Sequence, residues 1–422
     1  MKLLNVDTIE QAREKIFSYT KSWQLKIKSV SVKEAQGFIL AEDILSSCDI
    51  PSFRRSTVDG YAVISGDTAA ASDAVPVFLK QNGSVSMGKQ ADFFITSGEC
   101  AYVPTGGMLP GGTDAVVMIE YCEKENDVIA VNEAAACGAG TAEAGEDFQK
   151  GKLLLRKGSL IRPQETGALS AAGVIRINIF VPLSLSLFST GDELTAPENN
   201  PAPGEVRDIN TNMLTALAVK NGYNIVSSQL IRDDEDALEA AVRKAAGQSD
   251  IVIISGGSSQ GEKDFTASVI NRIAKPGVFT HGLAVKPGKP TIIGWDENSK
   301  TLFAGLPGHP VSAMMIFILL FNRLQEQIIN SGIQTAAFQI PVSPFHNSFP
   351  VPAKINCNVP GTPGRSVCLP VALELKDGIY IAQPVFGKAG MISALTNAHG
   401  FIIIDLNKEG LKKDEPVLVH LF

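Results

Sequence analysis

The spacing of apolar and polar residues changes several times along this 422-residue chain, and the changes mark predicted domains. Near the N-terminus Ile9, Ala12 and Ile16 fall on one helical face, and Thr8 with Gln11 fits a capping box, which predicts a helix beginning near Thr8. A second helix is predicted over residues 32–44, before Pro51 breaks the pattern.

Residues 51–147 consist of short β-prone runs between glycines, which predicts a small β-rich domain inserted between helical pieces. The clearest runs are residues 61–63, 75–79, 93–95 and 115–119. A short strand at 153–155 and a helix-like run at 163–172 follow. We expect residues 152–179 to be the return half of the N-terminal helical domain.

From Pro182 onward, strands and helices alternate, which predicts a mostly parallel sheet with helices on both faces. The predicted strands are 183–188, 223–231, 251–254, 291–294 and 302–305, and the predicted helices are 210–221, 235–246, 265–274 and 310–330. In such sheets ligands bind beyond the carboxyl ends of the strands. Polar loops leave strand ends at 189–193, 255–264 and 306–310, so we expect a site there.

After about residue 335 the chain is again β-prone, with prolines and turns, and five predicted strands suggest a small barrel. These strands are 338–342, 371–375, 379–383, 401–405 and 416–420. The fold class predicted for the whole chain is therefore multidomain α/β plus β.

Composition removes several classes of function. A net charge of −7 argues against a general nucleic-acid surface, which needs a basic stripe. The N-terminus lacks the apolar length of a signal peptide, and the longest apolar stretch, 313–321, is half of a membrane span. Six cysteines without CxxC spacing predict reduced thiols and no structural zinc site. We therefore expect a cytoplasmic protein that binds neither nucleic acid nor membrane.

The segment from Ser255 to Asp264 carries the strongest chemical signal. It joins a predicted buried strand to a helix through Gly256, Gly257 and Gly261, so backbone N–H groups can approach an oxyanion at a helix N-terminus. No Walker motif and no GxGxxG fingerprint is present. The two lysines of the Pro-Gly turn at 286–290 can reach one multiply charged anion, although a turn with two solvated lysines would give the same sequence.

Five acids form the second candidate constellation: Asp59, Asp147, Glu193, Asp233 and Asp264. Carboxylates beside an anion can ligate Mg²⁺ that in turn holds phosphate. Each acid also has a plainer interpretation. Asp233 and Asp264 can be helix N-caps, Asp59 a turn residue, and Asp147 a solvated side chain. Spacing alone does not decide between these interpretations.

His309, within Pro307–Ser312, is a candidate base, but a residue fixing the turn before a helix is favoured. No GxSxG motif occurs, so nothing indicates a Ser-His-Asp triad.

Taken in order, these motifs resemble the MoeA family of molybdopterin molybdenumtransferases, whose eukaryotic relative is the gephyrin E domain. The segments that carry the resemblance span nearly the whole chain. They are Pro51–Ala62 with its Ser-Thr-Val-Asp-Gly-Tyr-Ala run, Thr105–Val117, Gly145–Asp147, Ser189–Leu194, Asp208–Asn210, Ser255–Asp264, Lys286–Pro290 and Pro307–Ser312.

The resemblance implies four domains and an elongated homodimer. The domains are a discontinuous helical linker domain (1–50 and 148–181), a β-rich domain (51–147), a molybdopterin-binding α/β domain (182–332) and a C-terminal β-barrel (333–422). The implied site lies between the α/β domain of one copy and the β-rich domain of the other. The implied reaction is Mg²⁺-assisted insertion of molybdate into adenylylated molybdopterin with release of AMP, and transient contact with the molybdopterin adenylyltransferase is expected.

Site residues are carried over from the resemblance by motif. Asp59, Asp147, Glu193 and Asp264 are assigned to catalysis, and Asp59, Glu193 and Asp264 also to the metal. Substrate binding is assigned to Thr105, Ser189, Thr190, Gly191, Asp233, Ser255, Gly256, Gly257, Ser258, Gly261, Lys286, Lys289, Pro307 and Pro310.

The chain departs from the family pattern in two notable places: Ala142 stands where an arginine is usual, and His309 replaces the more usual Asn. The first departure keeps open a non-catalytic, gephyrin-like scaffold. A tungstate-inserting paralogue also stays open, as does a different nucleotide-processing enzyme built on the same α/β domain, such as a CinA-type enzyme. The matched N-terminal half argues against the CinA-type enzyme.

Overall fold

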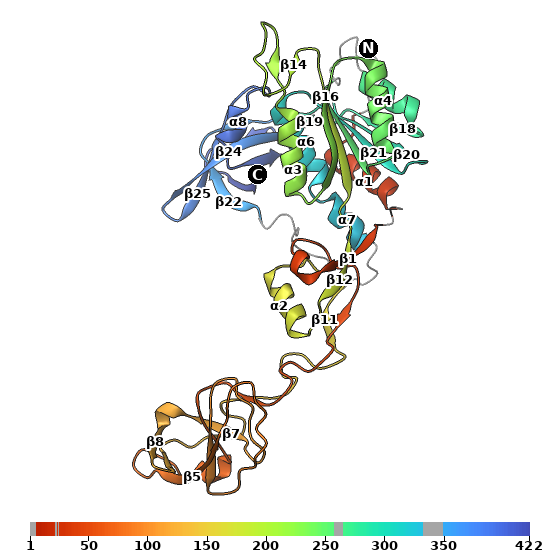
Figure 1. The fold of residues 1–422 in the computed structure, drawn as a ribbon. Coiled ribbons are helices and arrows are strands. Elements are labelled where there is room, and N and C mark those ends of the chain that lie inside the picture. The colour runs from red at the N-terminus through yellow and green to blue at the C-terminus, as the bar shows by residue number, and fades with distance from the viewer. Residues whose placement is uncertain (1–5, 22, 24, 257–264, 332–348) are drawn as a thin grey trace. The chain divides into compact units, whose positions relative to one another are not determined.

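A computed structural model describes residues 6–21, 23, 25–256, 265–331 and 349–422. The chain divides into two compact units (Figure 1). Unit 1 comprises Met1–Lys28, Gly37–Ile39 and Phe180–Phe422, and unit 2 comprises Ser29–Gln36 and Leu40–Ile179. Each unit has its own cores, so each is described separately.

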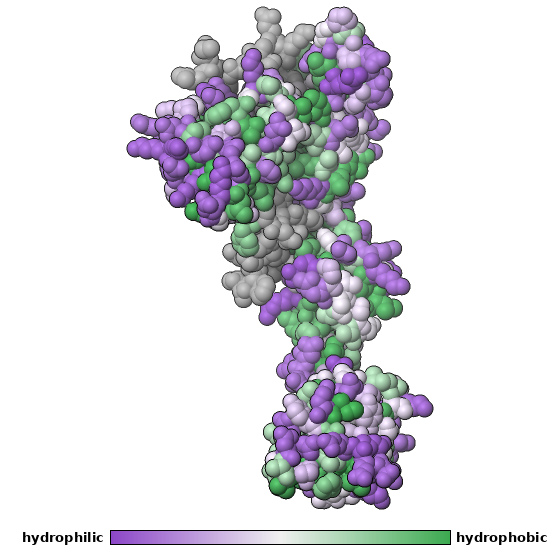
Figure 2. All heavy atoms as spheres, turned by 90° about the vertical axis from the view of Figure 1, so that its left-hand side faces the viewer, coloured by the Kyte–Doolittle hydropathy of each residue, from purple (hydrophilic) through white to green (hydrophobic). Residues whose placement is uncertain are grey.

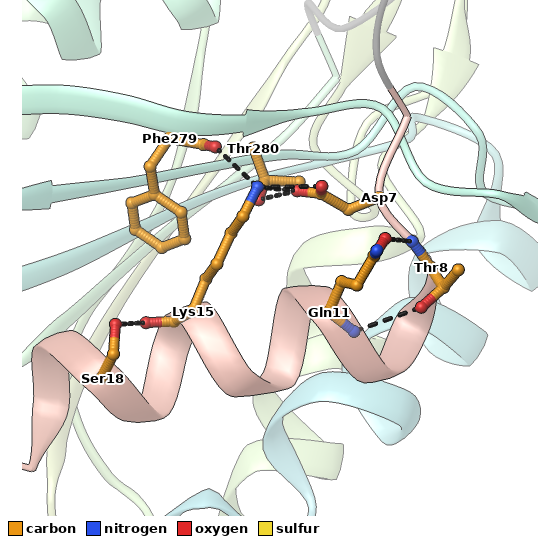
Figure 3. Close-up of polar contacts among 7 residues, drawn as sticks. All are labelled: Asp7, Thr8, Gln11, Lys15, Ser18, Phe279 and Thr280. Carbon is orange, nitrogen blue, oxygen red and sulfur yellow. Dashed lines mark hydrogen bonds and ion pairs between the residues drawn. The ribbon is translucent and has the colours of Figure 1, made fainter.

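Helix α1 (Ile9–Thr20) confirms the first sequence prediction. Thr8 caps it, and the Thr8 and Gln11 side chains form both bonds of a capping box. Its apolar face, with Ile9 and Ile16, packs into the main core of unit 1. Just before the helix, Asp7 accepts hydrogen bonds from Lys15 Nζ (2.7 Å) and Thr280 Oγ1 (2.6 Å), as Figure 3 shows. The N-terminal segment is thereby fixed to the α/β part of the chain.

The helix predicted over residues 32–44 is wrong. Only a short 3₁₀ turn, η1 (Val32–Glu34), forms, and strand β2 (Ile44–Leu45) follows later. Gly37 has a φ of +85°, which interrupts a helix. The N–H groups of Leu40 and Ala41 then donate to Ser159 O and Asn178 O instead of to a preceding turn.

The β-rich part of unit 2 contains a six-stranded sheet in the order β7-β4-β6-β5-β9-β8. Its strands are β4 (Gly60–Val63), β5 (Val77–Ser84), β6 (Glu99–Val103), β7 (Ala115–Met118), β8 (Cys122–Glu125) and β9 (Val128–Val131). Alternate residues of β4 enter two different cores: Tyr61 and Val63 join one, and Ala62 the other. The predicted run 93–95 forms only a bridge between Phe94 and Gly111.

The remaining elements of the first 180 residues are short. They are β1 (Ile27–Ser31), β3 (Arg55–Ser56), η2 (Ser65–Thr68), η3 (Ile119–Tyr121), β10 (Thr141–Ala142), β11 (Leu153–Leu155), α2 (Pro163–Ala171) and β12 (Arg176–Phe180). The observed β11 and α2 confirm the strand and helix predicted between residues 152 and 179. The β3 strand pairs with β10, and β2 pairs with β11.

The α/β part of unit 1 is a six-stranded sheet in the order β16-β13-β17-β21-β20-β18. Its strands are β13 (Ser184–Thr190), β16 (Asn224–Ile231), β17 (Ile251–Ser255), β18 (Pro276–His281), β20 (Ile292–Asp296) and β21 (Thr301–Leu306). The first four strands in spatial order are parallel, and β20 and β18 complete the sheet in antiparallel fashion. This confirms the predicted mostly parallel sheet, although β18 was not predicted.

Helices cover both faces of this sheet, as the side chains of β17 show. Ile251 and Ile253 enter the core formed with α1, α3 (Asn210–Lys220), α6 (Pro310–Phe321) and α7 (Leu324–Ser331). Val252 and Ile254 enter the core formed with α4 (Glu235–Ala246) and α5 (Phe265–Ile273). In Figure 1, α4 lies on one side of the sheet and α3 and α6 lie on the other.

The single long helix predicted over residues 310–330 is wrong in one respect, because it is two helices, α6 and α7. Leu320, Leu324 and Ile328 all enter the same core. The apolar pattern therefore continues across the break at Asn322–Arg323, so the spacing alone predicts a single helix.

The C-terminal part is a closed barrel, β24-β25-β22-β28-β26, in which β24 also pairs with β26. Its strands are β22 (Val351–Ile355), β24 (Ser366–Lys376), β25 (Ile379–Pro384), β26 (Gly400–Ile404) and β28 (Pro416–Leu421). Short pieces β23 (Val359–Pro360) and β27 (Gly410–Leu411) pair with each other, and α8 (Ser393–Thr396) lies between β25 and β26. The predicted strand 338–342 lies outside the described residues. The multidomain α/β plus β fold class is confirmed.

The face drawn in Figure 2 is mixed in character. Figure 2 shows hydrophilic and hydrophobic residues interspersed over one face of the molecule. No helix in the described ranges is long and apolar enough to cross a membrane.

Candidate functional site

Three adjacent parallel strands end side by side in unit 1, as the sequence predicted. Ser189 of β13 is the register partner of Ser255 of β17, which in turn is the partner of Leu306 of β21. Ser189 and Ser255 are each 1% exposed. Polar residues this deeply buried at the carboxyl edge of a parallel sheet mark the expected ligand position.

The N-terminus of α3 is attached to these strand ends by side-chain hydrogen bonds. Asn210 Nδ2 donates to Ser255 Oγ (2.9 Å) and to the carbonyl oxygen of Gly308 (2.7 Å). Thr211 Oγ1 donates to Ser189 Oγ (2.8 Å). Together these bonds connect β13, β17 and the loop after β21 to one helix start, whose dipole favours an anion.

Gly256 is required by this geometry. Its φ is +106°, and a Cβ at this position would lie 2.2 Å from the carbonyl oxygen of Thr190. Its N–H donates to Leu306 O at 3.1 Å. The backbone of the glycine turn is therefore pressed between the ends of β13 and β21, where a side chain has no room. Gly257, Ser258, Gly261 and Asp264 lie outside the described residues.

The carboxylates near this edge have different surroundings. Asp192 Oδ1 accepts from Asp233 N (3.2 Å), which brings the loop after β13 to the loop before α4. Asp208 Oδ1 accepts from Thr211 N (3.1 Å) at the start of α3. The interpretation of Asp233 as a helix N-cap is wrong, because Asp234 caps α4 by accepting from the N–H groups of Asp236 and Ala237. Glu193 is exposed, next to Gly191.

The lysine turn is held between the sheet and the barrel. Lys286 ends β19 (Val285–Lys286), which pairs in parallel with Ser366 and Val367 of the barrel strand β24. Gly288, with a φ of +118°, packs against Ile316 of α6, and its carbonyl oxygen accepts from Thr291 Oγ1 (2.7 Å). The Lys286 side chain is exposed and that of Lys289 is half-buried. A cation on an anchored turn can meet an anion without ordering a flexible loop.

His309 lies at the start of α6, where the favoured prediction placed it. It occupies the N-cap position without a side-chain capping bond, and Pro310 is the first helical residue. A Cβ built on Gly390 would lie 3.2 Å from His309 Cδ2, so the imidazole lies against the barrel loop. Pro307 is buried and Val311 N donates to Ala389 O at 3.2 Å.

Unit 2 holds the other group of predicted residues. Asp59 Oδ1 accepts from Thr105 N at 2.8 Å, which joins two of the predicted positions. Asp147 is exposed, and its backbone N–H donates to Ile50 O at 3.0 Å. Ala142 stands where the family usually has an arginine, and it is the register partner of Arg55 on strand β3. Arg55 is exposed, so the neighbouring strand still carries a guanidinium.

The predicted acids have the right chemistry to bind Mg²⁺, because carboxylate oxygens are its preferred ligands. Among the described residues, however, no group of three or more His, Cys, Asp or Glu side chains is arranged to hold a metal ion. Asp59 belongs to unit 2, Glu193 to unit 1, and Asp264 lies outside the described ranges.

Burial suppresses ionisation of the Cys100 and Cys122 thiols. It raises the pKa of Cys100 to about 12 and that of Cys122 to about 11, which keeps both protonated and unreactive at neutral pH. All six cysteines are free. This agrees with the prediction of reduced thiols.

The sequence interpretation missed Asn210 as a site residue, although it noted the Asp208–Asn210 segment. A polar residue at the first position of a helix is usually a cap, and nothing in its spacing marks it as buried. Its 6% exposure and its two donated bonds become apparent only when the three strand ends meet.

Three family models match the chain in consecutive order. A MoeA N-terminal region (domain I and II) matches residues 7–173, and a probable molybdopterin binding domain matches residues 186–326. A MoeA C-terminal region (domain IV) matches residues 352–422.

Curated relatives match over similar lengths. A protein of Methanocaldococcus jannaschii named for molybdopterin biosynthesis is 30% identical and covers 100% of both chains. Molybdopterin molybdenumtransferase of Haemophilus influenzae is 33% identical over 75% of this chain and 76% of its own. The enzyme of the same name from Bacillus subtilis is 27% identical over 98% and 93%.

Solved structures agree with these matches. A molybdopterin biosynthesis MoeA protein from Pyrococcus horikoshii has 35% identity, a TM-score of 0.79 and 99% coverage of each chain. A second structure of MoeA from the same organism has 28% identity, a TM-score of 0.82 and coverage of 99% and 100%.

Proposed function

Because the chain belongs to the MoeA family, we propose that it inserts molybdate into adenylylated molybdopterin, with release of AMP and assistance from Mg²⁺. Its place in molybdenum cofactor biosynthesis follows from the family. The observation that best supports a phosphorylated ligand is the convergence of Ser189, Asn210, Ser255 and Gly308 at the carboxyl edge of the sheet.

The residues at this edge would bind and orient the substrate. The start of α3 and the exposed Lys286 ammonium would attract its phosphate groups, since a helix N-terminus and a lysine both favour negative charge. The fixed positions of Ser189 and Ser255 would orient the ligand before reaction, which lowers the entropic part of the barrier.

The acids would serve the metal. In this proposal Asp59, Glu193 and Asp264 hold Mg²⁺, Asp147 acts in catalysis with them, and Asp233 binds the substrate. Mg²⁺ would offset the charge that develops on AMP as the phosphoanhydride bond breaks. Thr105 N–H would keep the Asp59 carboxylate oriented, which their 2.8 Å hydrogen bond supports.

We also propose a homodimer in which Asp59, Thr105 and Asp147 of one copy act with the α/β residues of the other. The four-domain division, with boundaries at residues 50/51, 147/148, 181/182 and 332/333, belongs to this proposal. So do a cytoplasmic location and a transient contact with the molybdopterin adenylyltransferase, which would deliver the adenylylated substrate.

A reconstitution tests the reaction. Purified chain, adenylylated molybdopterin, Mg²⁺ and either molybdate or tungstate are combined, and AMP release and active cofactor are measured. We expect metal-dependent AMP release that needs the oxyanion, and the preferred oxyanion separates the molybdenum enzyme from a tungstate-inserting paralogue. Absence of AMP release under every condition would favour the gephyrin-like scaffold.

Asp264→Asn is the sharper check on the metal. It keeps the size of the side chain but removes the charge, so turnover should be lost while the dimer remains intact by sedimentation. An unchanged rate would remove Asp264 from the site.

A further inference from the structure

Two buried side-chain oxygens at the carboxyl edge lack hydrogen-bond partners. Thr190 and Asn210 are 5% and 6% exposed, and neither Thr190 Oγ1 nor Asn210 Oδ1 forms a hydrogen bond with any residue that the structure describes. Buried polar atoms in native proteins are nearly always paired. An unpaired atom at a ligand-binding edge therefore points to a partner that the ligand supplies.

The orientation of the Asn210 amide is set by its neighbours. The carbonyl oxygen of Gly308 can only accept, so the atom that faces it at 2.7 Å must be the amide nitrogen. The same nitrogen donates to Ser255 Oγ at 2.9 Å. Oδ1 is consequently left as a fixed acceptor. Asn210 contacts the exposed residue Gly308 through Nδ2, while its Oδ1 is itself buried.

A second asparagine on the same helix shows that an unpaired oxygen alone does not make a site. Asn221, at the other end of α3, donates from Nδ2 to Leu217 O (2.7 Å), and its Oδ1 is likewise without a partner in the described chain. Its bond stays within its own helix. Asn210 differs because it joins two other segments, both at the edge where ligands of parallel sheets bind.

The unpaired Thr190 Oγ1 is a second reason to treat Asn210 differently from Asn221. Thr190 Oγ1 lies beside Gly256, because a Cβ built on Gly256 would be 3.0 Å from it. Gly308 is also close, because a Cβ built on Gly308 would be 3.6 Å from Gly256 Cα. The unpaired hydroxyl of Thr190 and residue Gly308, whose carbonyl Asn210 binds, thus both lie close to Gly256. A hydroxyl can donate or accept, so the pair offers one fixed acceptor and one adaptable group.

We propose that Asn210 is a specificity-determining residue whose Oδ1 accepts a hydrogen bond from the amino group of a nitrogen heterocycle. Molybdate and the phosphoanhydride phosphates of the proposed substrate are excluded as its partner, because at neutral pH they present acceptor oxygens without a proton. Thr190 Oγ1 pairs with a ring nitrogen or carbonyl of the same heterocycle. The inference rests on the proposed function, whose substrate contains two such amino groups, one on the pterin and one on the adenine.

Matched ligand pairs test this and identify the ring. Binding to the full chain is measured by calorimetry for a pterin and its 2-desamino analogue, and for AMP and purine riboside 5′-monophosphate, which lacks the 6-amino group. We expect one pair to differ by about tenfold in Kd, because loss of the donor leaves a buried acceptor unpaired. The pair that differs shows which ring Asn210 contacts.

Variants tie the effect to Asn210. Asn210→Ala should bind both members of the sensitive pair equally, whereas Asn221→Ala, the matched control, should keep the tenfold difference. Because Asn210→Ala also removes two structural bonds, thermal unfolding of each variant is followed. Ser255→Ala serves as a second variant, because it keeps Oδ1 and the bond to Gly308. It should weaken binding of both members alike, since Ser255 helps to orient the ligand, and it should keep their tenfold ratio.

Two results would overturn the inference: equal binding within both pairs by the unaltered chain, or equal loss of discrimination in Asn210→Ala and Asn221→Ala. If the unaltered chain releases AMP in the reconstitution but shows no discrimination, only this inference fails. If it neither releases AMP nor binds either ring, the proposed function fails with it.

Discussion

The candidate residues at the carboxyl edge of the α/β sheet and those in unit 2 are held in contrasting ways. Ser189, Asn210 and Ser255 are buried, and side-chain hydrogen bonds link Ser255 to Asn210 and Ser189 to the neighbouring Thr211. Asp59 and Thr105 are exposed and joined by a hydrogen bond of 2.8 Å, and Asp147 is also exposed. A buried, cross-linked set contributes to folding as well as to binding. Exposed residues can be substituted with little effect on folding. Substitutions in the unit 2 group should therefore change activity without changing stability.

Gly256→Ala should produce the largest effect and tests the buried side of the comparison. The new Cβ would lie 2.2 Å from Thr190 O, at a φ of +106° that alanine disfavours. We expect a loss of more than about 3 kcal/mol of unfolding free energy, measured by denaturant titration. Gly247→Ala is the control, because Gly247 ends α4 at a φ of −79° with space around it. Equal stability of the two variants would mean that the edge is not tightly packed.

Asp59→Asn should reduce activity while leaving the stability of the fold almost unchanged. Asparagine retains an oxygen for Thr105 N but removes the charge proposed to hold Mg²⁺, so AMP release should fall by about 100-fold or more. Unfolding free energy should change by less than about 0.5 kcal/mol, as for other surface substitutions. Asp73→Asn, another exposed aspartate of unit 2, should alter neither quantity. A large stability loss in Asp59→Asn would remove the contrast between the two groups.

Asp114 gives the smallest effect and shows that unit 2 has ordered carboxylates of its own. Burial raises the pKa of Asp114, but hydrogen bonds from Ser65 N (2.6 Å) and Ser65 Oγ (2.7 Å) outweigh burial and hold that pKa below its usual range. A carboxyl whose pKa is lower when folded stabilises the protein above its unfolded pKa of about 3.9, and this is lost as pH falls through the folded value.

We therefore expect Asp114→Asn to be about 1 kcal/mol less stable than the unaltered chain at pH 7. The difference should shrink as pH falls below about 4, as measured by thermal unfolding across pH. A difference that stays constant from pH 7 to pH 3 would show that the carboxylate charge is not its source.

Local signals in the sequence predicted much of the fold. The helix at 235–246 was predicted with its observed bounds, because a strong apolar stripe lies within the segment and a glycine, Gly247, directly follows it. The prediction for 32–44 failed because the partners of Leu40 and Ala41 lie more than a hundred residues away. Such partners leave no trace in local spacing.

The site residues were likewise predictable only where a motif in the sequence marks them. Motif order indicated Ser189, Ser255 and Lys286, and the structure places them at the ends of neighbouring strands or on an anchored turn. Asn210 was missed because its role depends on Gly308, which is 98 positions distant. Asp233 and Asp234 are equally good cap candidates by sequence. The structure distinguishes them, because Asp234 occupies the N-cap position of α4 and accepts from the N–H groups of Asp236 and Ala237.

The short segment before the lysine turn has a consequence for how this chain can be divided. Ala284 N donates to Asp7 O (2.8 Å), and Ser366 N donates to Ala284 O (2.9 Å). One residue thus joins the N-terminal segment, the α/β domain and the barrel by backbone bonds. An α/β domain excised alone would expose this edge to pairing with other chains. Exchange of parts between homologues should therefore succeed only when all three pieces are transferred together.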